Sequence, residues 1–226
     1  MKKSAIVFLL ATLGTVFFVT TASAQLGGLG GVGGIGGAKS NSGGDVDSQV
    51  KAFTDKSSEV QGLVYTSLKA VKSAYASSEE SAKIAEEVKA FNNITDPKEK
   101  QAKVAEALKS DSAKLEEIAK ANDAVDKTKK LDKEKQKQVA SGVMNFIIAG
   151  LRASELGTTG AGIMQSVSTN PMSAGKVVSV KDALPILADS ASTATKVFPE
   201  LVKVLQGANI QVPKVTAESK TEDVKF

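Results

Sequence analysis

The chain has 226 residues, of which 29 are Lys or Arg and 25 are Asp or Glu, and it contains no Cys, His or Trp. The missing residue types exclude Ser-His-Asp and Cys-His nucleophiles, zinc sites of the Cys/His type and disulfides. A single arginine, Arg152, and 4% aromatic residues also argue against nucleic-acid binding, which depends on guanidinium contacts and base stacking.

Residues 1–24 have the pattern of a secretory signal peptide. Lys2 and Lys3 precede an apolar run from Ala5 to Val19, and Ala22-Ser23-Ala24 supplies the small residues of a cleavage site. The run is shorter than the roughly 20 residues that span hydrocarbon, so cleavage after Ala24 is favoured over an anchor. We therefore expect an exported bacterial protein, periplasmic or extracellular, whose mature chain carries 27 basic and 25 acidic groups.

Residues 25–44 form a glycine-rich segment in which an apolar residue recurs at every third position, at Leu26, Leu29, Val32 and Ile35. Glycine at this density disfavours a helix, so a flexible spacer is the simpler interpretation. The period also permits an extended conformation with three residues per turn, which places all four side chains along one edge. That edge would bind a protein partner or a second copy of the chain.

Residues 45–138 predict amphipathic helices with a balanced coat of 18 Lys and 18 Asp or Glu. From Asp45 to about Tyr75 apolar residues step mostly by threes and fours, with serine at two positions of the stripe, Ser57 and Ser67. This spacing indicates one long helix with a narrow apolar face that suits packing of the coiled-coil type.

Two further helices are expected in the same charged region. One begins at Ser77 or Ser78 and ends near Asn92-Asn93, with acidic residues in its first turn. The next follows Asp96-Pro97, which is typical of an N-cap with proline at the first helical position, and it carries an apolar face as far as Val125.

The composition changes after residue 138, where charges become sparse and Ala, Ser and Gly become frequent. We expect a buried helix over 132–154, a glycine-broken passage over 157–162 and a short helix over 163–168. Asp182 is expected to open another helix with Pro185 near its first turn, and Pro199 a final one that ends at Gly207.

These elements predict an all-α fold, a multi-helix bundle in which long amphipathic N-terminal helices pack around an apolar C-terminal half. Residues 45–213 are expected to form a single domain and the polar residues 214–226 a disordered tail. A minor two-stranded ribbon between 176–180 and 210–212 is a less favoured alternative for those segments.

Six lysines lie close together in the sequence between the charged and the apolar regions, and they are candidates for binding anionic lipid or a polyanion: Lys127, Lys129, Lys130, Lys133, Lys135 and Lys137. The simpler interpretation is a solvated connection between two helices.

Catalytic patterns are weak throughout the chain. The spacing Ser-x-x-Lys occurs at Ser48 and at Ser173, but the companion motifs of penicillin-binding enzymes are missing. No sequence motif for a metal or a cofactor occurs either. We therefore expect no enzyme, no cofactor and no metal site.

The sequence favours a non-catalytic helical binding or structural protein, an accessory component of the bacterial envelope or extracellular matrix. Its partner would be a protein or a second copy, with contact to a membrane surface as a further option. One alternative is a membrane-active protein whose region 139–168 inserts, since its glycines permit close helix packing in lipid. Another is a carrier of an apolar ligand between helices.

Overall fold

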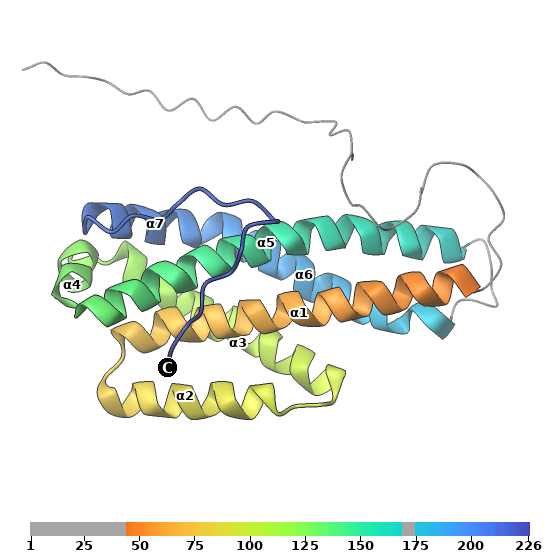
Figure 1. Ribbon diagram of the computed structural model, residues 1–226, viewed down its shortest axis with the longest axis horizontal. Coiled ribbons are helices and arrows are strands. Elements are labelled where there is room, and N and C mark those ends of the chain that lie inside the picture. The colour runs from red at the N-terminus through yellow and green to blue at the C-terminus, as the bar shows by residue number, and fades with distance from the viewer. Residues whose placement is uncertain (1–43, 169–174) are drawn as a thin grey trace, which may run out of the picture. The chain divides into compact units, whose positions relative to one another are not determined.

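The computed structural model describes residues 44–168 and 175–226, and within these ranges it contains α-helices and no strand. The helices pack into one compact bundle, which confirms the expected all-α fold (Figure 1). Their bounds are α1 Gly44–Tyr75, α2 Ser78–Asn92, α3 Pro97–Lys120, α4 Ala124–Lys130, α5 Lys133–Ser168, α6 Val178–Lys196 and α7 Phe198–Gly207. Across the described ranges, none of these helices combines the length and the apolar character needed to cross a membrane.

Side-chain caps fix the starts of the second and third helices where the sequence indicated. The Ser77 hydroxyl accepts a hydrogen bond from the backbone N–H of Glu80, and the Asp96 carboxylate accepts one from the backbone N–H of Lys98. Each cap satisfies a donor that the first helical turn leaves without an intrahelical partner. Pro97 occupies the first turn of α3, where its missing N–H costs nothing.

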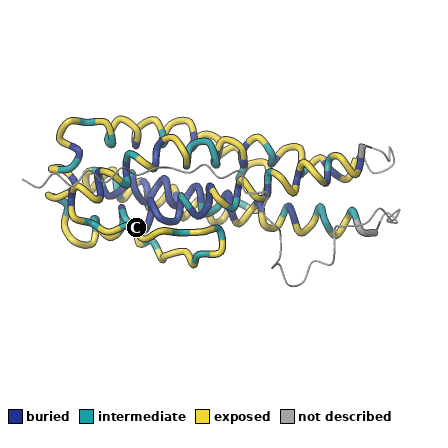
Figure 2. The backbone as a smooth tube through the Cα atoms, turned by 90° about the horizontal axis from the view of Figure 1, so that it is seen from above, coloured by how far each residue is buried: buried dark blue, intermediate teal, exposed yellow. Residues whose placement is uncertain are grey.

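Helix α1 is a centre of the bundle, because it packs against α2, α3, α5 and α6. Its C-terminal half is buried on most sides, and Figure 2 shows buried positions concentrated where helices face one another. Ser57 and Ser67 lie in this buried stripe with almost no exposure. The core joins α1 to the apolar residues of α5, and Phe146 of α5 stacks on Phe198 of α7 with ring centroids 4.0 Å apart.

Helix α5 runs without interruption through the three glycines at positions 157, 160 and 162, so the expected glycine-broken passage is wrong. Tertiary contact explains the difference at Gly160, where a Cβ atom would lie 2.7 Å from Phe53 and 2.8 Å from Leu184. The missing side chain at Gly160 lets α1 and α6 approach α5 closely, so the packing offsets the low helix propensity of glycine.

The expected third helix is divided in two, since α3 ends at Lys120 and Val125 belongs to the separate α4. Ala121 is extended, and the Asn-Asp pair that follows favours turns over helix interiors. Tertiary bonds hold α4 in place. The buried Thr128 hydroxyl lies 2.8 Å from the Tyr75 hydroxyl at the end of α1, and the Gln136 side chain donates to carbonyls at the end of α4.

Helix α6 begins at Val178, four residues before the expected start at Asp182, so Pro185 lies inside the helix. Val180 is fully buried, and its burial helps to offset the hydrogen bond that Pro185 cannot donate. The ribbon between 176–180 and 210–212 is not formed, because residues 175–177 form a 3₁₀ turn that leads into α6 and residues 210–212 have no regular structure.

Helix α7 ends at Gly207 as expected, but the left-handed residue that caps it is Asn209 rather than Gly207. Asn209 has φ = 62°, its N–H donates to the Gln206 carbonyl, and the N–H of Ile210 donates to the Leu205 carbonyl. This is the Schellman arrangement, and asparagine replaces the usual glycine because it tolerates positive φ.

Residues 214–226 follow a defined path without regular secondary structure. A turn joins Thr216 to Ser219, and the segment then forms hydrogen bonds with Asn145 and Arg152 of α5. These contacts differ from the disordered tail expected from its polar composition.

Candidate functional site

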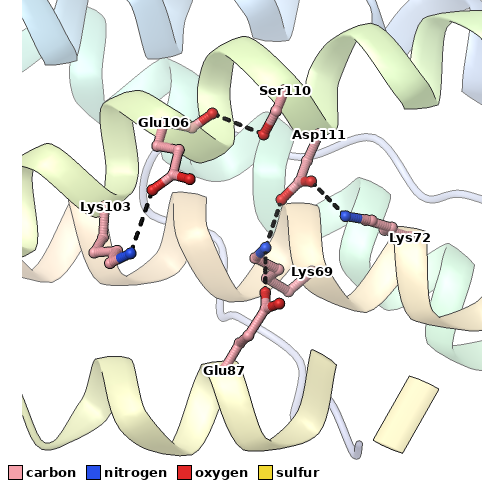
Figure 3. Close-up of polar contacts among 7 residues, drawn as sticks. All are labelled: Lys69, Lys72, Glu87, Lys103, Glu106, Ser110 and Asp111. Carbon is pink, nitrogen blue, oxygen red and sulfur yellow. Dashed lines mark hydrogen bonds and ion pairs between the residues drawn. The ribbon is translucent and has the colours of Figure 1, made fainter. Parts of the chain in front are cut away.

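The most unusual chemistry of the described residues is a buried ion-pair network between α1, α2 and α3 (Figure 3). Lys69 Nζ lies 2.6 Å from the Glu87 carboxylate and 2.9 Å from the Asp111 carboxylate. Lys72 Nζ lies 2.8 Å from the second oxygen of Asp111. The side chains of Asp111 and Lys69 are 2% and 9% exposed, whereas Glu87 is 51% exposed and links the network to solvent.

A groove of about 420 Å³ opens beside this network, with α1 at its floor and α2 and α3 at its sides. Its apolar part contains Tyr65 and Phe91, whose rings stack with centroids 3.9 Å apart. The Lys69 ammonium lies 5.4 Å from the centre of the Tyr65 ring, within the range of a cation–π contact. The exposed rim of the groove carries three acidic side chains, Glu87, Glu99 and Glu106, and one basic side chain, Lys103.

The network keeps Lys69 in its charged form. Burial alone would lower the pKa of Lys69, but the hydrogen bonds that its ammonium donates to Glu87 and Asp111 outweigh burial and raise that pKa above its ordinary value. Burial is also the main cause that raises the pKa of Tyr65, and the positive charge of Lys69 only partly opposes it. A charged lysine and a neutral tyrosine therefore face the groove at neutral pH.

Both tyrosines of the chain are expected to ionise above the ordinary tyrosine pKa of about 10. Burial raises the pKa of Tyr75 as well, and its hydrogen bond to Thr128 offsets only part of that rise. A spectrophotometric titration of tyrosinate measures this directly, because the chain has no tryptophan. The groups with raised pKa stabilise the fold below about pH 10, and this contribution is lost as pH rises through the raised values. A tyrosine that ionises at or below pH 10 in the folded protein contradicts the burial described.

Single-tyrosine variants assign the two ionisations. Only Tyr75 titrates in the Tyr65→Phe protein, and only Tyr65 titrates in the Tyr75→Phe protein. In the Tyr75→Phe protein, adding Glu87→Gln removes a negative charge that raises the pKa of Tyr65, so the remaining ionisation is expected to shift downward.

The six lysines that are candidates for binding a polyanion lie on α4 and on the first turns of α5. All except Lys135 are exposed. Lys127 pairs with Asp123 at 3.0 Å, and Lys135 Nζ donates to the Ala76 carbonyl at 3.4 Å. Two of the six lysines therefore already make contacts within the chain.

The other residues singled out from the sequence fall partly outside the described ranges. Leu26, Leu29, Val32 and Ile35 lie outside the described residues, as does Ser173. Lys51 is exposed and pairs with Asp55 at 2.7 Å, one turn away on α1. Lys176 pairs with Asp47 at 2.7 Å. Across residues 44–168 and 175–226, no group of three acidic side chains is arranged to hold a metal ion.

Sequence reasoning missed the ion-pair network, although one signal of it was present. Asp111 falls between Leu108 and Leu115 in the apolar stripe of α3, at a position that should carry an aliphatic residue. A charged residue in such a stripe is buried only with a partner of opposite charge. The identity of those partners depends on the packing of α1 and α2, which the sequence pattern leaves open.

Comparisons of the chain with protein-family models, with curated proteins and with solved structures find no match.

Proposed function

We propose that this is an exported, non-catalytic helical binding protein, an accessory component of the bacterial envelope or extracellular matrix, and that a partner docks in the groove between α2 and α3. Export rests on the pattern of residues 1–24, with cleavage after Ala24. Binding in the groove rests on one observation, the open groove of about 420 Å³ beside a buried ion-pair network.

The cost of the network supports a role beyond stability. Removing Lys69 and Asp111 from water carries a desolvation cost that apolar side chains at the same two positions would avoid. Buried ion pairs of this kind fix geometry, and here Lys69 joins α2 to α3 through Glu87 and Asp111. The two helices that flank the groove are thereby held at a set distance, which suits preorganised binding.

The chemistry of the rim indicates the kind of partner. Three glutamates and one lysine are exposed there, so the rim has a net negative charge next to the Tyr65–Phe91 pair. A partner segment with a cationic side chain fits this rim, because its positive charge would meet the exposed carboxylates of Glu99 and Glu106.

Neutralising the rim is expected to reduce partner capture by roughly tenfold, which corresponds to about 1.4 kcal/mol of binding free energy. The change is Glu99→Gln with Glu106→Gln, both exposed on α3. The measurement is crosslinking and capture from the native envelope fraction with the exported protein as bait. The intact mass of the bait should match a chain that begins at Gln25.

A matched control lies further along the same helix. Glu116→Gln with Glu117→Gln removes the same two charges from exposed positions of α3 outside the groove. We expect this control to capture the partner as the native protein does. Equal losses in both variants would show a nonspecific charge effect, and no loss in either would remove the groove from the proposal.

A further inference from the structure

The C-terminal segment, residues 214–226, lies across α5 and is held there through its main chain (Figure 1). Asn145 uses both ends of its amide on one residue. Its Nδ2 donates to the Glu222 carbonyl at 2.7 Å, and its Oδ1 accepts from the Glu222 N–H at 2.8 Å. A residue in an antiparallel sheet makes the same pair of bonds with the residue opposite it. Asn145 is only 2% exposed, so its amide is aimed at the segment rather than at solvent.

The only arginine of the chain holds the same segment two turns further along α5. Arg152 Nε donates to the Ala217 carbonyl at 2.7 Å and Nη2 donates to the Ser219 carbonyl at 3.1 Å. Its third nitrogen lies 3.4 Å from the Glu59 carboxylate of α1, which orients the guanidinium group. The segment therefore runs antiparallel to α5, with residues 217–219 near Arg152 and residue 222 near Asn145.

The segment itself contributes little apolar burial. None of the residues 214–226 is fully buried, and most are exposed, including Glu218, Glu222 and the terminal Phe226. A segment held by a few polar bonds and little apolar contact has low local stability and opens more readily than the core. The surface of α5 around Asn145 and Arg152, which we call the strap surface, thus recognises an extended chain by its backbone.

We propose that the strap surface also binds residues 214–226 of a second copy, so that two molecules associate by exchanging their C-terminal segments. Every copy carries both the surface and a segment that already fits it, and reciprocal exchange preserves each hydrogen bond. Residues 211–213 have no regular structure and connect the capped end of α7 to the segment, so they act as the hinge of the exchange. This contact is separate from the groove, which is lined by α1, α2 and α3.

Two full-length variants separate the surface from the segment. Glu222→Pro removes the N–H that donates to Asn145 Oδ1, so this molecule has an intact strap surface and a segment that binds it less tightly. Asn145→Leu removes both amide bonds, so this molecule has a defective surface and an intact segment that only Arg152 still holds. The equimolar mixture is expected to form a one-to-one complex at least tenfold more tightly than either variant associates with itself. Native mass spectrometry over a concentration series measures both.

The control is Asp223→Pro, because the structure gives the Asp223 N–H no role in holding the segment and proline favours an extended residue before it. Mixed with Asn145→Leu, this variant keeps its own segment seated and should not form the complex. Thermal unfolding must first show that each variant folds. If Asn145→Leu does not fold, Arg152→Lys replaces it, because lysine lacks the guanidinium fork that holds Ala217 and Ser219. Folded variants that stay monomeric in the mixture, or a complex that forms equally with Asp223→Pro, would overturn the proposal.

Discussion

Replacing Asp111 by leucine is expected to lower the free energy of unfolding by about 3 kcal/mol, at the low end of the range for breaking a buried ion pair. The substitution leaves Lys69 only 9% exposed and deprives it of one of its two carboxylates. The Glu87 carboxylate remains 2.6 Å from Lys69 Nζ, so Lys69 keeps one partner and the loss of stability stays at the low end of the range. Lys72 is 24% exposed and can turn toward water, so it adds little. Urea unfolding of the native protein and of the variant measures the difference.

A second substitution tests whether the loss comes from the unpaired charge. Lys69→Met combined with Asp111→Leu removes both buried charges and fills the space with apolar side chains. We expect the double variant to recover most of the lost stability, because well-packed apolar residues often replace buried ion pairs without cost. The double-mutant cycle compares Lys69→Met, Asp111→Leu and their combination. Its interaction energy should therefore be large and opposite in sign to the stability that each single variant loses.

The exposed charge Glu117 on the same helix supplies the reference. Its pair with Lys114 at 3.0 Å is open to water, so Glu117→Leu should change stability by no more than about 0.5 kcal/mol. If Asp111→Leu costs no more than this reference, the carboxylate is not buried with its partners as the structure has it.

Features that depend on residues close together in the sequence could be predicted from the sequence alone. The starts of α2 and α3 follow from Ser77 and from Asp96-Pro97, because a cap needs only its own first turn. The apolar stripe of α1 also follows from local spacing, and Phe53, Val60, Val64 and Val71 are buried as their positions indicate. Helix spacing is a property of short stretches of chain, so no knowledge of tertiary contacts is required.

Features that depend on distant residues could not be predicted in the same way. Gly160 disfavours a helix by itself, and only the approach of Phe53 and Leu184 explains why α5 continues through it. The start of α6 depends on the burial of Val180 rather than on a capping residue. The path of residues 214–226 depends on Asn145 and Arg152, which lie more than 60 positions earlier in the chain.

The candidate site combines both situations. The polar position at Asp111 was visible in the stripe of α3, but the partners Lys69 and Glu87 look like ordinary surface charges in the sequence. They become a network because α2 folds back onto α1 beside α3. The glycine-rich segment has no such signal, and its role in partner binding stays a prediction.

Replacing Gly150 by alanine is expected to lower the free energy of unfolding by about 2 kcal/mol, as overpacking of a close contact does. A Cβ atom at Gly150 would overlap the Cβ atom of Ala194 on α6. An alanine Cβ has no rotamer that could move it aside, so the backbones of α5 and α6 must separate. The gain in helix propensity from glycine to alanine, about 1 kcal/mol, is too small to compensate.

Gly157→Ala is the matched control on the same helix, because nothing lies within 4 Å of the added Cβ atom. There the gain in helix propensity is unopposed, so this variant should be more stable by about 0.5–1 kcal/mol. The two substitutions are chemically identical and should differ in sign. Adding Ala194→Gly to Gly150→Ala moves the missing methyl group to the facing helix and should restore most of the loss. If Gly150→Ala stabilises the protein as Gly157→Ala does, then α5 and α6 do not meet at this position.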